Sequence, residues 1–431
     1  MSEPHPNARG NPRVAGYACL RCGAAYPADH PIDSRGCGIC RRDAPSNLEV
    51  AYTAESLARR TMPRMSPADG LTAFADYLPV DADEMISLGE GHTPLIPAAR
   101  LGRRLGIGNL LIKDESRNPT WSHKDRFSAV AVSAAKRQGH RFVATASSGN
   151  AGASLAAYAA RAGLTCLVVT FEGAPGPMVD QIGRYGAVVV ELADKTRRWP
   201  ILAEGVARFG WFVTSPFETP VVGSHPDGIE GYKTIACELV LQQQGRVPDW
   251  VVVPTAYGDN LRGIWRGFCD LRAAGVIDRL PKMVAAEIHG SVRDSLARPA
   301  DTLVTARDPF PTRALSIGTV QGTFQSLVSV RRSGGTAEVV TDAALWQTQA
   351  GLARHEGIFG ELSGVTSIAA AGQLRRRGII GPDDSVVCIM TASGLKDIDQ
   401  RPPHPAIRYR VTGGLDEVLK HLTAEFGAGP A

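Results

Sequence analysis

Short, fully apolar segments alternate with alanine-rich segments over most of the chain. The apolar segments lie at residues 110–113, 142–145, 164–170, 187–192, 250–254, 283–287 and 385–390. Between them, stretches such as 127–138 and 150–162 place their apolar residues with helical spacing. Apolar strands that alternate with helices indicate a parallel sheet covered on both faces. The pattern therefore predicts an α/β protein.

The regions outside this alternation differ in character. Residues 1–18 are polar and interrupted by proline, so we expect a disordered tail, followed by a cysteine-rich module at residues 19–50. A polar stretch then runs to about residue 85 and holds an amphipathic segment at 71–78. Prolines and paired glycines in residues 290–335 predict loops and short elements.

Composition narrows the choice of partners. The chain has 431 residues, with 47 Lys and Arg against 43 Asp and Glu, a net charge of +4. A nucleic-acid-binding protein usually has a clear basic excess, so we expect no nucleic-acid partner. No segment approaches the roughly 20 apolar residues that span a membrane, and the first residues lack the apolar core of a secretory signal. We therefore expect a cytoplasmic protein without a membrane partner.

Four of the eight cysteines form two C-x-x-C pairs separated by fourteen residues: Cys19, Cys22, Cys37 and Cys40. Two such pairs can complete a tetrahedral zinc site, which would be structural because four thiolates leave no open position. The alternative, two disulfides, fits poorly with a reducing compartment. The other four cysteines stand singly in apolar segments and are expected in the core.

Two segments that follow predicted strands are candidate anion sites. Residues 147–152, S-S-G-N-A-G, precede a predicted helix, where backbone N–H groups can bind an anion; an ordinary capped helix start is the alternative. Residues 255–263, T-A-Y-G-D-N-L-R-G, occupy a similar position and match neither a P-loop nor G-x-G-x-x-G.

Lys124 lies in the sequence S-H-K-D-R, at a predicted loop-to-helix junction. A lysine there is usually a surface charge, but a lysine with a lowered pKa can form a Schiff base. A helix N-terminus or the neighbouring Arg126 could lower that pKa.

Together these segments resemble threonine synthase. The matching motifs are L-G-E-G-H-T-P-L (88–95), K-D-E-S-R-N-P-T-W-S-H-K-D-R (113–126), S-S-G-N-A-G (147–152), E-G-Y-K-T (230–234), E-G-I-F (356–359) and T-A-S-G-L-K-D (391–397), in this order. The resemblance covers roughly residues 70–400 and implies a fold type II pyridoxal-phosphate enzyme of the tryptophan synthase β superfamily. It implies two doubly wound α/β domains within residues 51–431, with a smaller subdomain at roughly 120–222. An N-terminal zinc-ribbon-like module at 19–50 also fits the resemblance, and relatives are often homodimers.

The resemblance also implies roles for individual residues. Lys124 would hold pyridoxal 5'-phosphate as a Schiff base and then move protons, and Asn150 would bind the phenolic oxygen of the cofactor. Thr391 would face the pyridine nitrogen. The substrate carboxylate would be bound by Ser147, Ser148 and Gly149. The cofactor phosphate would be held by Ala256, Tyr257, Gly258, Asp259 and Asn260.

Several positions depart from the family pattern. His123 stands where the family usually has Phe, and Gly228 stands where it has the Arg that binds the phosphate of O-phosphohomoserine. The implied reaction converts O-phosphohomoserine to threonine and phosphate. The alternatives are elimination or replacement on a different amino acid, as in cysteate synthase or the dehydratases, and a regulatory protein that binds amino acids without turnover.

Overall fold

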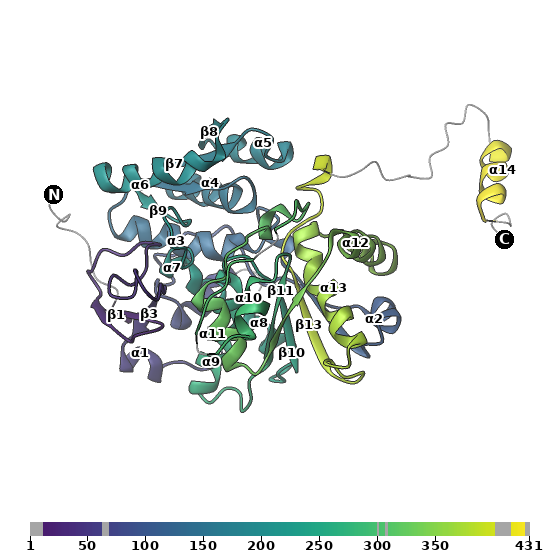
Figure 1. The fold of residues 1–431 in the computed structure, drawn as a ribbon, viewed down its shortest axis with the longest axis horizontal. Helices are drawn as coiled ribbons and strands as arrows, with labels where there is room; N and C mark the ends of the chain where they lie inside the picture. The colour runs from purple at the N-terminus through teal and green to yellow at the C-terminus, as the bar shows by residue number, and fades with distance from the viewer. Residues whose placement is uncertain (1–11, 63–68, 300, 307–308, 401–414, 427–431) are drawn as a thin grey trace. The chain divides into compact units, whose positions relative to one another are not determined.

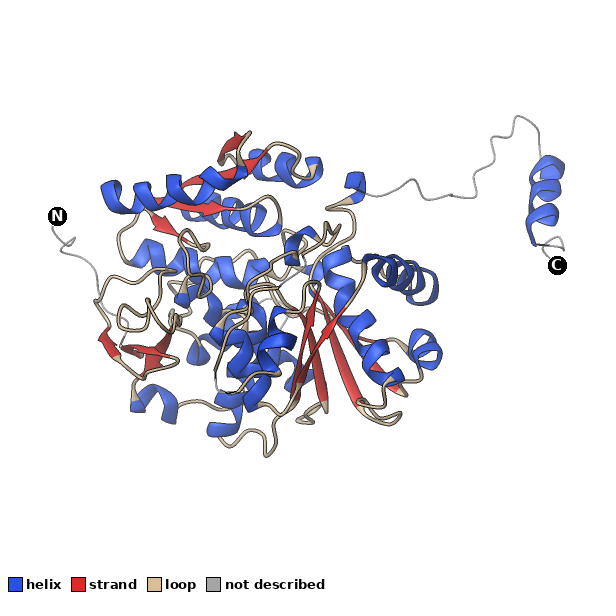
Figure 2. Ribbon diagram, in the orientation of Figure 1, coloured by secondary structure: helices blue, strands red, loops and turns tan. Residues whose placement is uncertain are grey.

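The computed structural model describes residues 12–62, 69–299, 301–306, 309–400 and 415–426. Residues 1–398 form one compact unit, and residues 399–431 form a second that contains the helix α14, Leu415–Phe426. In the described residues no helix is both long enough and apolar enough to cross a membrane. The first unit contains three sheets (Figures 1 and 2).

The largest sheet has six strands in the order β12-β11-β10-β13-β5-β4, and all neighbours except β4 and β5 run parallel. Its strands are β4 (Leu95–Pro97), β5 (Asn109–Asp114), β10 (Trp250–Pro254), β11 (Lys282–Glu287), β12 (Thr336–Val339) and β13 (Ser385–Met390). Val251 and Val253 contribute to one hydrophobic core, whereas Trp250 and Val252 contribute to another. Both faces of the sheet are therefore buried, as the unbroken apolar segments predicted.

Helices from different parts of the chain cover the two faces of this sheet. One face is covered by α2 (Ala99–Leu105), α12 (Asp342–Glu356) and α13 (Leu362–Arg376). The other is covered by α9 (Asp259–Ala273), α10 (Ser291–Leu296) and α11 (Phe324–Arg332), with α8 (Lys233–Gln242) packed against α9. Figure 1 shows this layered arrangement around β10 and β13.

A second, all-parallel sheet has the order β8-β7-β6-β9. Its strands are β6 (Phe142–Ala146), β7 (Thr165–Phe171), β8 (Val188–Leu192) and β9 (Phe212–Val213). Three helices pack on this sheet: α4 (Asn150–Ala162), α5 (Gly176–Arg184) and α6 (Arg198–Phe209). The helix α3 (Lys124–Arg137) packs against α4. These elements lie within the predicted smaller subdomain of residues 120–222, whose limits stay a prediction.

The N-terminal module is a three-stranded antiparallel sheet of β1 (Val14–Cys19), β2 (Ala25–Pro27) and β3 (Leu48–Tyr52). The predicted disordered tail of residues 1–18 is therefore wrong for residues 14–18, and its first eleven residues lie outside the described residues. Val14 and Tyr17 are buried in a small core with Leu48 and Val50. Because three of its six residues are glycine or alanine, this strand gave too weak an alternation of apolar and polar side chains to be recognised.

The described part of residues 290–335 contains two short helices, α10 and α11, between loops, in line with the predicted loops and short elements. Thr323 caps α11 by accepting a hydrogen bond from the Ser326 backbone N–H. The predicted amphipathic segment at 71–78 is the 3-10 helix η1, Gly70–Tyr77. The remaining short elements are α1 (Ala54–Ala58), α7 (Pro226–Glu230), η2 (Glu115–Arg117), η3 (Lys195–Arg197), η4 (Leu315–Ile317) and η5 (Ile398–Gln400).

Candidate active site

A cavity of about 870 Å³ lies at the carboxyl ends of the parallel strands. The segments that line it follow β6, β10 and β13 directly, the usual position of a ligand site in an open α/β sheet. Every residue predicted to bind cofactor or substrate lines this cavity: Lys124, Ser147, Ser148, Gly149, Asn150, Ala256, Tyr257, Gly258, Asp259, Asn260 and Thr391. Segments separated by more than 260 residues thus meet in one site.

Lys124 is the first residue of α3 and is held in place by its neighbour. The backbone N–H of His123 donates to the carbonyl oxygen of Thr391 at 2.9 Å, and the His123 ring stacks on Tyr232. Burial lowers the pKa of the Lys124 amine, while the carboxylates of Asp259 and Glu361 oppose this shift. A lowered pKa raises the fraction of neutral amine, which is the nucleophilic form.

Arg126 does not lower the pKa of Lys124, although the sequence suggested that it could. Its guanidinium is fully buried and pairs with Glu115 at 2.7 Å and Glu238 at 2.6 Å. Lys113 adds a third ion pair to the same group, 2.6 Å from Glu238. This network therefore anchors α3 to β5 and α8, and it contributes to the site only by positioning the helix that begins at Lys124.

The loop before α4 has features of both alternatives that the sequence left open for residues 147–152, an anion site and an ordinary capped helix start. The hydroxyl of Ser147 accepts hydrogen bonds from the backbone N–H groups of Gly149 at 3.2 Å and Gly152 at 3.0 Å, as in a capped helix start. Ser147 and Ser148 also line the cavity, where their hydroxyl groups can donate to a ligand. At Gly149 a Cβ would lie 2.5 Å from the sulfur of Met178, so a larger residue there would displace the Met178 side chain.

Residues 256–260 form the turn from β10 into α9. Gly258 has a φ of 78°, and a side chain there would overlap the hydroxyl of Ser326. The Asp259 carboxylate accepts hydrogen bonds from the Ser224 backbone N–H at 3.0 Å, the Ser224 hydroxyl at 2.7 Å and the Gln325 amide at 2.6 Å. These donors satisfy the Asp259 carboxylate, whose negative charge would otherwise be unfavourable beside a bound phosphate.

Several buried polar atoms that face this site have no hydrogen-bond partner among the described residues. They are Oδ1 of Asn150, both amide atoms of Asn260 and the hydroxyl of Ser363. A buried polar atom without a partner is costly, so it indicates a missing ligand. The unpaired atoms lie beside Lys124 and the α9 N-terminus, a set that suits a ligand with a phosphate group and an aldehyde.

The structure adds a carboxylate that the sequence analysis did not select. Glu361, the N-cap of α13, accepts hydrogen bonds from the Asn150 amide at 2.6 Å and the Ser316 hydroxyl at 2.7 Å. Burial raises the pKa of Glu361. Its signal in the sequence was its position two residues after the E-G-I-F motif.

Gly228, where the family has a phosphate-binding Arg, does not line the cavity in the described structure. It lies in α7, and a side chain on it would overlap the ring of Phe127. Phe127 is buried against Tyr232, with ring centres 5.9 Å apart. The space beside Gly228 is thus filled by an aromatic ring, and an anionic substrate must be bound by other groups.

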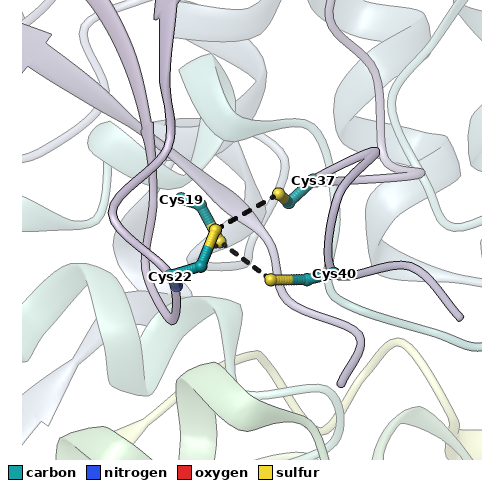
Figure 3. Close-up of side chains that lie close together, drawn as sticks. All are labelled: Cys19, Cys22, Cys37 and Cys40. Atoms are coloured by element: carbon teal, nitrogen blue, oxygen red, sulfur yellow. Dashed lines mark hydrogen bonds between the residues drawn. The ribbon is translucent and has the colours of Figure 1, made fainter. Parts of the chain in front are cut away.

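The four predicted metal ligands form a cluster in the N-terminal module (Figure 3). All four sulfur atoms lie within 4.8 Å of one another, and both the Cys19–Cys40 and Cys22–Cys37 pairs are 3.8 Å apart. None of the four is in a disulfide. Zinc–sulfur bonds of about 2.3 Å in a tetrahedron place the sulfur atoms about 3.8 Å apart, so the cluster has the dimensions of a zinc site.

Comparison with known proteins agrees with this geometry. Residues 86–392 match the family model described as "Pyridoxal-phosphate dependent enzyme", and the chain belongs to this family. It is 35% identical to the threonine synthase of Methanocaldococcus jannaschii over 88% of this chain and 93% of that protein. It is 33% identical to the threonine synthase of Methanosarcina acetivorans over 88% and 91% of the two chains.

Solved structures show the same fold at lower identity. Maize serine racemase superimposes with a TM-score of 0.61 at 21% identity, covering 72% of this chain and 90% of that one. A threonine deaminase from Solanum lycopersicum gives 0.60 at 21% identity, over 70% and 79% of the chains. The fold type II architecture is thus confirmed, and the chain is a pyridoxal-phosphate-dependent enzyme that resembles threonine synthase.

Proposed function

We propose that this protein is a threonine-synthase-like lyase that releases phosphate from O-phosphohomoserine and adds water to give threonine. The observation that supports this most directly is the meeting of Lys124, Asn150 and the α9 N-terminus in one cavity. Lys124 would hold pyridoxal 5'-phosphate, with the cofactor phosphate at residues 256–260. When bound, this cofactor withdraws electrons from the carbon atoms next to the amino group of the substrate.

The residues of the chain supply binding and proton transfer. The lowered pKa of Lys124 lets its amine accept a proton from Cα and pass it to a neighbouring carbon. Ser147 and Ser148 would bind the substrate carboxylate from the start of α4. Asn150 would bind the phenolic oxygen of the cofactor, with its orientation set by Glu361. Thr391, a neutral hydroxyl, would face the pyridine nitrogen.

An anionic side chain of the substrate needs a cation, and among the described residues two cations line this cavity besides Lys124. Lys195 and Arg198 reach it from η3 and the start of α6. Among the described residues neither side chain forms an ion pair, and Nε of Arg198 donates to the backbone carbonyl oxygen of Lys195 at 3.0 Å. Burial lowers the pKa of Arg198, the cost expected for a guanidinium without a carboxylate partner. We propose that Arg198 binds the phosphate of the substrate.

Replacing Arg198 with Ala is expected to lower kcat/KM for O-phosphohomoserine roughly 10- to 100-fold, because a charge-assisted hydrogen bond contributes about 1.5–3 kcal/mol. The measurement is phosphate release by the purified holoenzyme. The matched control is Arg197→Ala, which removes the adjacent exposed guanidinium that does not line the cavity. Equal activity of both variants would contradict the role of Arg198.

A second candidate function is elimination or replacement on a different amino acid, which Gly228 favours because it supplies no guanidinium at this position and Phe127 fills the space beside it. A panel of amino acids, monitored by the visible spectrum of the bound cofactor, separates the two. Phosphate release above that of a Lys124→Ala control supports the first function. No release, together with turnover of another amino acid, supports the second.

We also propose that the four cysteines bind one structural zinc ion, forming a zinc-ribbon-like module. Replacing Cys37 with Ser should remove the zinc and lower the free energy of unfolding by at least about 3 kcal/mol, since a structural metal stabilises the fold directly. Zinc content and denaturant unfolding measure the two effects. Cys269→Ser, at a partly buried cysteine outside the cluster, should keep the metal. A Cys37→Ser variant that keeps both zinc and stability would disprove the site.

A further inference from the structure

Asn47 is one of the buried side chains that connect the N-terminal module to the catalytic unit. Its backbone lies between the two cysteine pairs. The carbonyl oxygen of Asn47 accepts from the Leu20 N–H at 3.3 Å, and that of Ser46 accepts from the Cys37 N–H at 2.9 Å. Only 1% of the residue is exposed. The position of Asn47 therefore depends on the fold of both cysteine pairs.

The side chain of Asn47 points out of the N-terminal module, toward the segments around Ser224 and Gln325. Its amide nitrogen donates to the carbonyl oxygen of Ser224 at 3.1 Å and to Oε1 of Gln325 at 3.3 Å. Its amide oxygen accepts from the backbone N–H of Leu48 at 2.9 Å, which defines the orientation of the amide. A single side chain thus binds two segments that are about 100 residues apart.

Those two segments form hydrogen bonds with residues 257–259, in the turn from β10 into α9. The Gln325 amide nitrogen donates to the Tyr257 carbonyl oxygen at 2.9 Å and to Asp259 at 2.6 Å. Because Asn47 occupies Oε1 of Gln325, the amide nitrogen must face the turn. Ser224 binds the same carboxylate with its backbone N–H and its hydroxyl.

The packing at this junction is tight. A side chain on Gly223 would meet the amide nitrogens of Gln325 and Asn47 and the carboxylate of Asp259 all at once. Asn47, Gln325 and Asp259 therefore pack closely around Gly223. A displacement of Asn47 would change its hydrogen bond with Gln325, and Gln325 in turn is hydrogen-bonded to Tyr257 and Asp259.

We infer that Asn47 is a positioning residue for the turn at residues 256–260. Through Asn47, cofactor binding depends on the folding of the cysteine module. The inference rests on the proposed function in one respect, that residues 256–260 bind the cofactor phosphate. It assigns the module a role in the site as well as in stability. The effect of Asn47 is directed at the phosphate group of the cofactor, and the aldehyde group reacts elsewhere, at Lys124.

An effect on the phosphate group alone can be distinguished from a general loss of stability, because a loss of stability would weaken the binding of ligands with and without a phosphate. Apoprotein is titrated with pyridoxal 5'-phosphate and with pyridoxal, which lacks the phosphate, and the visible absorption band gives both dissociation constants. Asn47→Ala should weaken binding of pyridoxal 5'-phosphate about 10-fold, the effect of losing one or two hydrogen bonds. Binding of pyridoxal should change less than 2-fold.

Two further variants complete the experiment. Tyr17→Phe removes the hydrogen bond from Tyr17 to Asp227 at 3.0 Å, another contact of the module, and should leave both constants unchanged. Gln325→Glu keeps the shape of the side chain but replaces both donors with a carboxylate beside Asp259. It should weaken only pyridoxal 5'-phosphate, even if Asn47→Ala does not fold.

Three results would overturn the inference. Equal weakening of the two ligands by Asn47→Ala and Gln325→Glu would indicate a structural role alone, and no weakening would indicate no connection. If the wild-type protein bound neither ligand at Lys124, the proposed function itself would fail, which distinguishes that failure from the first two.

Discussion

Replacing Lys124 with Ala is expected to lower kcat by at least about 10³-fold, because the variant loses both the covalent anchor of the cofactor and the base at Cα. Lys124 lies at the centre of the cavity wall, with its pKa lowered by burial. The measurement is the turnover rate with the substrate identified by the panel. The visible band of the lysine-bound cofactor should disappear at the same time.

Lys136→Ala is the matched control for this variant. Lys136 lies in the last turn of the same helix, is exposed and does not line the cavity. It should keep the band and the activity of the wild type. A Lys124→Ala enzyme with more than about a tenth of wild-type kcat would contradict the assignment of Lys124 as the reacting lysine.

Replacing Arg126 with Met is expected to lower the free energy of unfolding by about 3–5 kcal/mol, because it leaves the buried carboxylates of Glu115 and Glu238 without their main counter-charge. Lys113 remains, but it pairs with Glu238 alone. Denaturant unfolding of the purified protein measures the change. The reduced order at the start of α3 should also weaken cofactor binding.

Arg117→Met provides the comparison for this effect. Arg117 pairs with Asp114 at 3.1 Å, but 68% of its side chain is exposed. An ion pair with so exposed an arginine contributes at most about 1 kcal/mol, and the buried Asp114 carboxylate keeps its hydrogen bonds from the backbone N–H and hydroxyl of Ser116. This variant should therefore unfold at nearly the wild-type denaturant concentration. Equal losses for the two arginines would show that the buried network is not the main source of stability in this region.

The parallel strands could be predicted because both of their faces are buried, which makes each one a continuous apolar segment. The segments at 110–113, 142–145 and 250–254 correspond to β5, β6 and β10. The helix α11 was missed because its buried face carries polar residues, including Gln325, Ser326 and Ser329. The apolar residues Phe324, Leu327 and Val328 have helical spacing, but the buried polar residues between them weaken the pattern, and their hydrogen bonds exist only in the folded protein.

Site residues that immediately follow strands could be predicted for a similar reason, since the carboxyl ends of parallel strands meet at one edge of the sheet. Glu361 and Arg198 could not, because their distance from Lys124 is set by the packing of α13 and α6. Gly228 shows the converse case. Its departure from the family pattern was visible, but only the structure shows that Phe127 fills the adjacent space.

The central claim is that Lys124 holds pyridoxal 5'-phosphate covalently in this cavity. Reduction of the holoenzyme with borohydride, followed by proteolysis and mass spectrometry, fixes the cofactor to the lysine that carries it. The account predicts one pyridoxyl group per chain, on Lys124. Absence of the group, or its location on another buried lysine such as Lys113, Lys233 or Lys396, would contradict it.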